Sequence, residues 1–306
     1  MVFFRPFVAA AAAAAVGLSG CAGTATTPPA VRSAASVQAA LPLSPPPACT
    51  SKVYVADYAR NDIEIYPQGV NNPAPCGKIS TGISAPEGIY ADAKGRLYVA
   101  NYLSSSVTEY ARGKRTPSLT ISTAAPPYDL FVGSDGTLYV AEATQDAVAE
   151  YARGKTTPFQ TLSINGGPHG VATDNKNNLY VSYLSNSDGV SHVEKFAPRA
   201  TTGSDLGFTV GFAGEVKLDA ANDVVIGDRN TDTVYLFPPG QTTPSRSFGT
   251  AGAPVNFSLD SAEANIYVSG LGQVQIINFQ TGAQTGSIAK GLTSPSGVAL
   301  YPPAPY

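Results

Sequence analysis

The chain has 306 residues, of which 43% are apolar and 13% are charged, so it is long enough for one large domain with a sizeable core. Its formal net charge of −3 excludes a global positive field that would favour nucleic acid or an anionic membrane surface. Trp is absent, whereas Gly and Pro occur 30 and 25 times, a composition typical of many short strands joined by turns. We therefore expect no nucleic-acid partner and a domain built from β-strands.

Residues 1–20 are expected to lie outside the fold as a signal peptide. One charge, Arg5, precedes an apolar run over residues 7–18, which is short for a membrane-spanning helix. The segment ends in a Leu-Ser-Gly-Cys sequence that finishes at Cys21 and resembles the lipobox of bacterial lipoproteins. The resemblance implies cleavage before Cys21 and a lipid on this cysteine, which would anchor the exported protein to the cell envelope. Ordinary secretion is the alternative.

Residues 21–48 are predicted to be a disordered tether. The segment consists almost entirely of Ala, Pro, Thr, Ser and Val, and Arg32 is its only charge. Such a composition cannot bury enough side-chain surface to offset the entropy lost on folding.

Cys49 and Cys76 remain as a pair once Cys21 is assigned to the lipid. Two cysteines in an exported protein most simply form one disulfide, which here would close a span of 27 residues from position 49 to position 76. A loop of that length is worth roughly 3–4 kcal/mol in the chain-entropy model. Two free thiols, or half of a metal site, are the alternatives, although no third ligand lies nearby in the sequence.

A five-residue strand pattern recurs through the remaining chain. Its clearest copy covers residues 97–101, and the second residues of the copies stand at positions 54, 98, 139, 180, 225 and 267, which are 41–45 residues apart. Alternating β-branched and aromatic residues favour a strand, and a period in the forties is typical of a repeat architecture.

One repeat unit shows four predicted strands, over residues 86–92, 97–101, 107–110 and 119–122. Four short antiparallel strands in about 40 residues are typical of one β-propeller blade. The pattern Pro-x-Gly-Ile/Val, then Gly-x-Leu-Tyr-Val-Ala-Asp/Asn, then Val/Ile-x-x-Tyr/Phe resembles NHL-type repeats and the six-bladed propellers of the gluconolactonase class.

The first and last predicted strands complement each other, which predicts six blades. The propeller is assigned to residues 49–302. The first strand, at Val53, is a second strand without an inner partner, and the last, near Pro295, is an inner strand with nothing after it. Pairing the C-terminal strand with the N-terminal blade closes a ring of six four-stranded antiparallel blades and removes the exposed sheet edges. The predicted fold class is therefore an all-β six-bladed β-propeller.

One face of such a propeller, here called the top face, carries the blade-to-blade loops and the loops after each second strand. Only Arg60 and Arg229 oppose ten acidic residues that map there. These residues are Asp57, Asp62, Glu87, Asp129, Glu142, Asp146, Asp188, Glu215, Asp228 and Asp232. An acidic surface attracts divalent cations or cationic ligands. Alternatively, Asp and Asn side chains after a strand cap the following turn.

The inner strands begin around the central channel on the top face. The residues at these six entrances are Glu87, Tyr128 with Asp129, His169, Glu215, Asn256 and Ser296. Four of them (Glu87, Asp129, Glu215 and Asn256) offer oxygen ligands of the kind that Ca²⁺ or another divalent cation takes. His169 is either a catalytic group for proton transfer or a hydrogen-bonded wall residue.

The resemblance to the gluconolactonase class implies a divalent ion held by a glutamate, an asparagine and aspartates, which would polarise a lactone carbonyl and activate water. Glu87 and Asn256 match that set, whereas the aspartate expected late in the order is missing, because Ser296 occupies the last entrance and Val255 another. Because the set is incomplete, we expect a monomeric, lipid-anchored binding module whose top face binds a protein or a small molecule. A lactonase-like hydrolase and a purely structural envelope protein are the alternatives.

Overall fold

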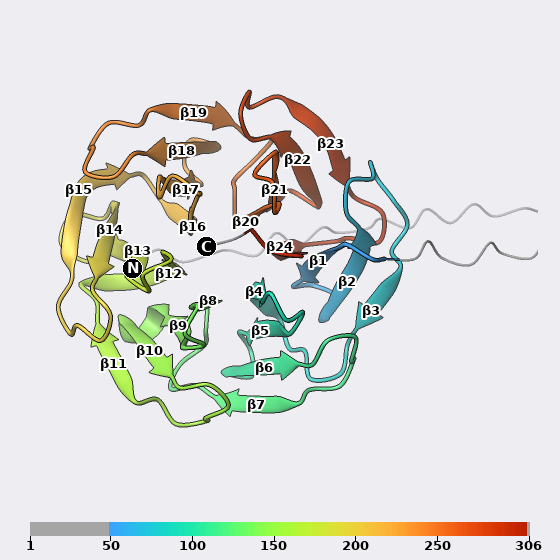
Figure 1. Ribbon diagram of the computed structural model, residues 1–306, viewed down its shortest axis with the longest axis horizontal. Helices are drawn as coiled ribbons and strands as arrows, with labels where there is room; N and C mark the ends of the chain where they lie inside the picture. Colours follow the sequence, from blue (N-terminus) through green and yellow to red (C-terminus); the bar gives the residue numbers. More distant parts are fainter. Residues whose placement is uncertain (1–48, 305–306) are drawn as a thin grey trace, which may run out of the picture. The chain divides into compact units, whose positions relative to one another are not determined.

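The computed structural model describes residues 49–304. The predicted signal peptide, the tether and Cys21 lie outside the described residues. Six four-stranded antiparallel sheets stand around one axis (Figure 1), so the predicted β-propeller is confirmed. Within the described range the one helical element is the short 3₁₀ turn Ala143–Gln145, and no helix there is long and apolar enough to span a membrane.

Each blade runs from an inner strand at the axis to an outer strand at the rim. Blade 1 contains β4 (Pro86–Ala91), β5 (Leu97–Asn101), β6 (Ser106–Tyr110) and β7 (Leu119–Ser122). Blade 2 contains β8 (Asp129–Val132), β9 (Leu138–Glu142), β10 (Ala147–Tyr151) and β11 (Gln160–Ser163). Blade 3 contains β12 (Gly166–Thr173), β13 (Leu179–Ser185), β14 (Ser191–Phe196) and β15 (Ser204–Val210).

The remaining blades have the same order from axis to rim. Blade 4 contains β16 (Ala213–Leu218), β17 (Val224–Asp228), β18 (Thr233–Phe237) and β19 (Arg246–Gly249). Blade 5 contains β20 (Asn256–Leu259), β21 (Asn265–Gly270), β22 (Gln273–Asn278) and β23 (Gln284–Ile288). Blade 6 contains β24 (Pro295–Tyr301), β1 (Lys52–Asp57), β2 (Asp62–Pro67) and β3 (Gly77–Ile79).

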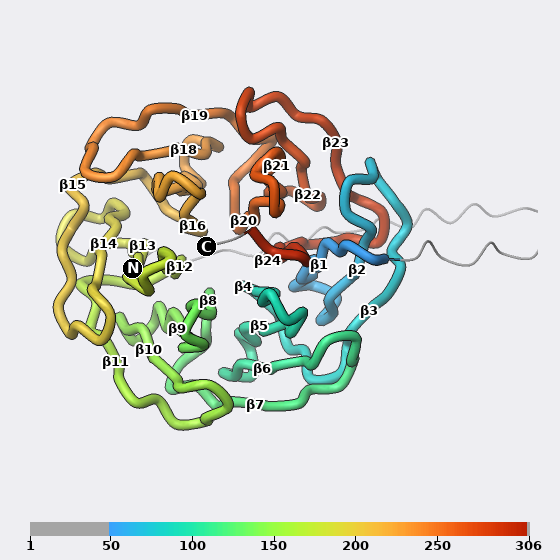
Figure 2. The backbone as a smooth tube through the Cα atoms, viewed as in Figure 1, coloured from blue at the N-terminus to red at the C-terminus, as the bar shows by residue number. Residues whose placement is uncertain are grey.

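Blade 6 joins the two ends of the described chain. Its inner strand β24 pairs antiparallel with β1, so that Val53 lies opposite Leu300 and Val55 opposite Val298. Figure 2 shows the red β24 beside the blue β1. The predicted closure of the ring by the C-terminal strand is therefore confirmed.

The second strands are buried on both faces, which explains why they repeat most clearly in the sequence. All five residues of β5 and of β9 are buried, because each sheet is packed between two neighbouring blades. Tyr54 and Ile65 of blade 6, for example, share one apolar cluster with Leu97 and Tyr110 of blade 1. A strand packed on both sides favours β-branched and aromatic residues at every position.

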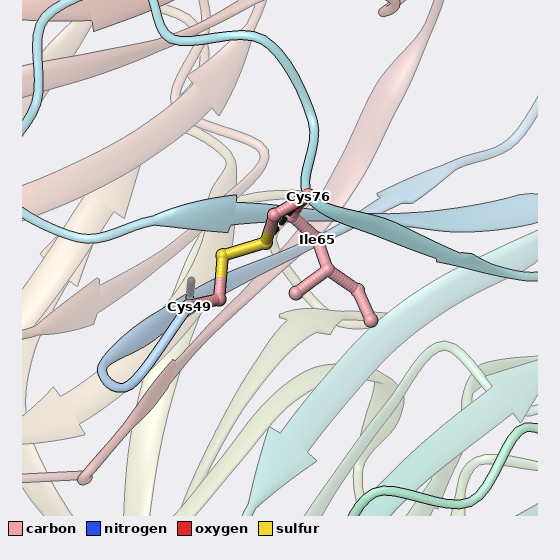
Figure 3. The surroundings of a disulfide bond; sticks show 3 residues. All are labelled: Cys49, Ile65 and Cys76. Carbon is pink, nitrogen blue, oxygen red and sulfur yellow. Dashed lines mark hydrogen bonds between the residues drawn. A yellow bond between two sulfur atoms is a disulfide. The ribbon is translucent and has the colours of Figure 1, made fainter. Parts of the chain in front are cut away.

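The predicted disulfide between Cys49 and Cys76 is present, with Cα atoms 6.3 Å apart (Figure 3). It ties the start of the described chain to the residue that precedes β3, the outer strand of blade 6. Cys76 Sγ also lies 3.2 Å from the carbonyl oxygen of Ile65 on β2. A disulfide is typical of an oxidising compartment outside the cytoplasm.

Candidate functional site

The acidic residues of the top face are mostly part of the fold. Six of the ten are buried: Asp57, Asp62, Asp129, Glu142, Glu215 and Asp228. Asp57, for example, accepts hydrogen bonds from the backbone N–H groups of Thr293 and Ser294 at 2.5 and 3.1 Å, and so fixes the loop before β24. The accessible negative charge of this face is therefore smaller than the sequence count indicates.

Three predicted ligands meet inside the channel, on the inner strands β8, β16 and β20. Glu215 Oε2 accepts a short hydrogen bond from Asn256 Nδ2, and the Asp129 carboxyl lies within hydrogen-bonding reach of Glu215. Lys217, on the same strand as Glu215, places its ammonium nitrogen 2.5 Å from Glu215 Oε1. All four side chains are buried.

Sequence analysis missed Lys217, although its position contains a usable signal. Glu215 and Lys217 are two residues apart on one strand, so their side chains project from the same face of the sheet. An acidic residue and a lysine at that spacing on an inner strand predict a buried ion pair in the channel.

Burial raises the pKa of Asp129, and burial followed by the negative charge of Asp129 raises that of Glu215 well above its usual range. The hydrogen bond from Glu215 lowers the pKa of Asp129, so Glu215 is the carboxyl that holds the proton more tightly. Lys217 lowers both values but supplies only one positive charge. Asp129 Oδ1 is buried and receives no hydrogen bond from the N–H and hydroxyl groups within residues 49–304. One proton shared by the two carboxyls would satisfy this oxygen and leave the network neutral.

The channel residues do not fit a divalent cation as they are arranged. Asn256 Oδ1 accepts from the Val298 N–H at 2.9 Å, and Asp129 Oδ2 accepts from the Val171 N–H at 2.9 Å. Since Lys217 already supplies the positive charge beside Glu215, an ion there would face an ammonium group. Between Cys49 and Ala304, no group of three or more His, Cys, Asp or Glu residues is arranged to hold a metal.

Several entrance residues form hydrogen bonds between neighbouring blades. The Val171 N–H donates to Asp129 and the Val298 N–H donates to Asn256, and each bond links one inner strand to the next. Ser296 is buried, and its hydroxyl donates to the carbonyl oxygen of Pro86 at 2.6 Å. These side chains therefore help to hold the ring closed.

Above this network, aromatic side chains from five blades line the mouth of the channel. We call Tyr58, Tyr102, Tyr128, His169 and Phe212 the aromatic arc. Successive ring centroids lie 6.5, 5.3, 5.2 and 5.1 Å apart, and each ring is half-buried. The sequence predicted Tyr128 and His169 at this position but gave no reason to include the other three, which lie in loops.

A carboxyl and a guanidinium accompany the aromatic arc. The Arg229 guanidinium carbon lies 5.0 Å from the Phe212 ring centre, a cation–π arrangement. Burial raises the pKa of Glu87 to about 7, and the charge of Arg229 opposes this shift. Glu87 is therefore separate from the buried network of Asp129 and Glu215, and it faces Arg229 instead.

His169 is neutral at pH 7 in this environment. Burial, and then the positive charge of Arg229, lower its pKa to about 4. Its Nδ1 atom is buried and makes no well-formed hydrogen bond within the described part of the chain. A neutral imidazole at a channel mouth can donate to or accept from a ligand.

Comparison with known proteins supports the fold. No protein-family model matches the sequence, and no curated protein matches it either. A chain in the crystal structure of a nidogen/laminin complex is similar with a TM-score of 0.67 and 17% identity, covering 82% of this chain and 98% of that one. A Bacteroides caccae protein of unknown function is similar with a TM-score of 0.64 and 12% identity, covering 82% of this chain and 98% of that one.

Streptogramin B lyase is also similar, with a TM-score of 0.53 and 14% identity over 80% of this chain and 76% of that one. At these identities the likeness concerns the fold alone, because one scaffold hosts many functions. The chain is a six-bladed β-propeller, and these solved structures are similar to it in fold.

Proposed function

We propose that this chain is a lipid-anchored binding module of the cell envelope that holds its ligand at the channel mouth on the top face. The observation that carries the proposal is the aromatic arc, in which half-buried rings from five blades lie in succession at the channel mouth. Ligand sites are typically lined by aromatic side chains with a few convergent polar groups. Glu87 and Arg229 provide such groups here.

The arc suits a ligand that inserts a flat or apolar group between rings and forms hydrogen bonds at its edge. Tyr and Arg are the residue types that contribute most binding energy in protein interfaces. A chain with this fold takes part in a nidogen/laminin complex, which supports a role for the scaffold in binding proteins. Asp146, Asp188 and Asp232, which with Glu87 are the acidic residues of this face that are not buried, would favour a basic partner at the rim.

The position at which the chain enters the domain is compatible with binding at the top face. Lys52, the first residue of β1, pairs with Tyr301 at the end of the inner strand β24. Inner strands begin on the top face, so the chain enters on the opposite face. A tether from Cys21 would therefore join the domain on the face opposite to the channel mouth and leave the mouth open to a ligand.

A divalent-metal-dependent lactonase-like hydrolase is the second candidate. It is favoured by the meeting of Asp129, Glu215 and Asn256 in the channel and by the pKa of about 7 at Glu87, which suits a general acid or base. Lys217 argues against it, because its ammonium stands beside the carboxyls that a cation would need. We expect Ca²⁺, Zn²⁺ or a chelator to leave the melting temperature unchanged; a rise with metal, together with lactone hydrolysis, would favour the hydrolase.

The binding proposal is tested with the immobilised protein and a solubilised envelope extract of the source cell. The double variant Tyr102→Ala/Phe212→Ala should retain its bound molecules roughly 10-fold less well, since an aromatic contact contributes about 0.5–1.5 kcal/mol. Phe159→Ala, at an exposed ring in the loop between β10 and β11, is the matched control. Equal retention by all three proteins would contradict the proposal.

A further inference from the structure

A cavity lies on the face opposite to the channel mouth, between blades 6 and 1. We call this the bottom face; it carries the turns after the inner strands and the loops between third and fourth strands. The cavity has a volume of about 240 Å³. Its apolar wall is formed by Tyr54, Ile65, Ile79, Leu97 and Tyr110.

The rim of this cavity is positively charged. Lys52, Lys114 and Arg115 line it, and no Asp or Glu does. The Arg115 guanidinium lies against the Gly77 backbone, 3.3 Å from where a Cβ atom of residue 77 would stand. Arg112 precedes them in the same loop without lining the cavity itself, and its guanidinium carbon lies 5.2 Å from the Tyr301 ring centre.

These four cations have no carboxylate partner among residues 49–304, in contrast to other basic residues of the propeller. Lys78, for example, pairs with Asp62, and Arg96 pairs with Asp92 at 2.6 Å. Burial and the nearby charge of Arg112 lower the pKa of Lys52, which shows that like charges are held together here. A cluster of unpaired cations on an apolar wall favours a ligand that has an anionic group and an apolar part.

We propose that this cavity binds the phosphate headgroup of an anionic phospholipid in the membrane that carries the anchor. The inference rests on the proposed anchoring at Cys21, because the chain enters the domain beside the cavity, at Cys49. The cations would hold the phosphate, and the apolar wall would cover the glycerol and the first methylene groups. Residues 21–48 are a poor alternative occupant, because their only charge, Arg32, is itself positive.

The chain offers a matched control for the charge of this surface. The loop Arg112-Gly113-Lys114-Arg115 of blade 1 has a counterpart, Arg153-Gly154-Lys155, in blade 2 on the same face. Lys114→Gln/Arg115→Gln and Arg153→Gln/Lys155→Gln thus remove equal charge from equivalent loops. Only the first pair lines the cavity.

The experiment measures flotation of residues 21–306, with Cys21→Ser, on vesicles of phosphatidylcholine with and without phosphatidylglycerol. This chain retains every strand from β1 to β24 and has no lipid of its own. The Lys114→Gln/Arg115→Gln variant should bind phosphatidylglycerol vesicles roughly 30-fold less tightly, the ratio expected when two basic residues near an anionic surface are lost. The blade 2 variant should lose less than about 3-fold, since its charges act only at longer range.

Three outcomes would overturn the inference. Equal losses in both variants would mean that diffuse charge, not the cavity, binds the vesicles. Full competition by inorganic phosphate at the concentration of the lipid would indicate a free-anion site. Binding that emerges only after removal of residues 21–48 would mean that the chain itself fills the cavity. The mass of the Cys21 peptide from cells reports the anchoring separately, so the two proposals can fail independently.

Discussion

Within the channel, Lys217 is the residue on which the buried carboxyls depend. It is the one cation whose ammonium lies within 4 Å of Glu215 in the described structure, and its nitrogen also lies 5.4 Å from the Phe131 ring centre. Asp129 and Glu215 come from different blades, so loss of the cation beside them would act directly on the packing of the ring. A buried ion pair need not stabilise a fold, but removing one partner leaves an uncompensated charge.

Replacement of Lys217 by Met should therefore reduce the free energy of unfolding at pH 7 by about 3–5 kcal/mol, measured by urea unfolding. The loss should shrink as the pH falls, because protonated carboxyls need no cation. Glu215→Gln added to Lys217→Met removes one of the two carboxyls and should recover part of the loss. A destabilisation below about 1 kcal/mol that does not vary with pH would show that the carboxyls do not depend on Lys217.

Glu87 should give the channel mouth a pH dependence of its own. Its pKa in the folded protein, about 7, lies above the ordinary value of 4.5, so the folded state binds this proton more tightly than the unfolded chain does. Its contribution to stability is present below pH 4.5 and is lost as the pH rises towards 7. Glu87→Gln should flatten the melting temperature over this window, whereas Asp232→Asn, at an exposed residue of the same face, should not.

Among single elements, the disulfide stabilises the N-terminal part of blade 6, where it joins the residues before β1 to the start of β3. It holds the residues before β1 against β3, which has only three residues and pairs with β2 alone. Such a short outer strand has few hydrogen bonds with which to stay in place.

Cys49→Ser/Cys76→Ser should lower the free energy of unfolding by roughly 3 kcal/mol, as expected when a loop of this length is freed in the unfolded chain. Chemical unfolding measures the loss, and hydrogen exchange should show that β3 becomes less protected than β7 of blade 1. A reductant should destabilise the wild type but not the variant. An unchanged unfolding midpoint in the double variant would contradict this account.

The sequence predicts the elements of this fold well and the contacts of their side chains less well. Residues 97–101 and 119–122 are strands with the predicted bounds, because burial on both faces imposes a clear pattern on each blade. β12 begins at Gly166, before the predicted start near His169, because β13 continues to Ser185 and pairs with it. Such an extension depends on the partner strand, which a local pattern does not report.

The sequence likewise predicts only part of the candidate site. The repeat period fixes where each inner strand begins and so predicts Asp129, Glu215 and Asn256 as site residues. These three side chains meet in the structure, whereas Glu87 of the same predicted set lies apart from them. Tyr58 and Tyr102 were missed because they lie in loops, where spacing says nothing about which rings meet across blades. The burial of the top-face carboxylates likewise could not be predicted from their charge alone.

At the scale of the whole molecule, the ring is closed by one strand from the far end of the chain. β24 supplies the inner strand of blade 6 and also packs against β4 and β20 of the neighbouring blades. Val298 and Leu300 on this strand are buried in an apolar cluster with residues of β1. Without β24, blades 5 and 1 would both lose a neighbour at the axis.

Deletion of residues 295–306 should therefore abolish the cooperative thermal unfolding of the domain, because the ring would be open at the axis and the inner edge of β1 exposed. Deletion of residues 305–306 alone, which follow the last residue described, is the control and should leave the melting temperature unchanged. A truncated protein that melts cooperatively at the wild-type temperature would contradict the role assigned to closure.

The two faces of the ring are expected to have different roles, with the channel mouth turned to the ligand and the bottom face turned to the membrane. Photo-crosslinking in intact cells tests this most directly, with p-benzoylphenylalanine at Tyr102 in the aromatic arc or at Phe159 on the bottom face. We predict a discrete adduct from Tyr102 that Arg229→Gln abolishes, and no such adduct from Phe159. The same adducts from both positions, or none from Tyr102, would contradict the assignment of the channel mouth as the binding site.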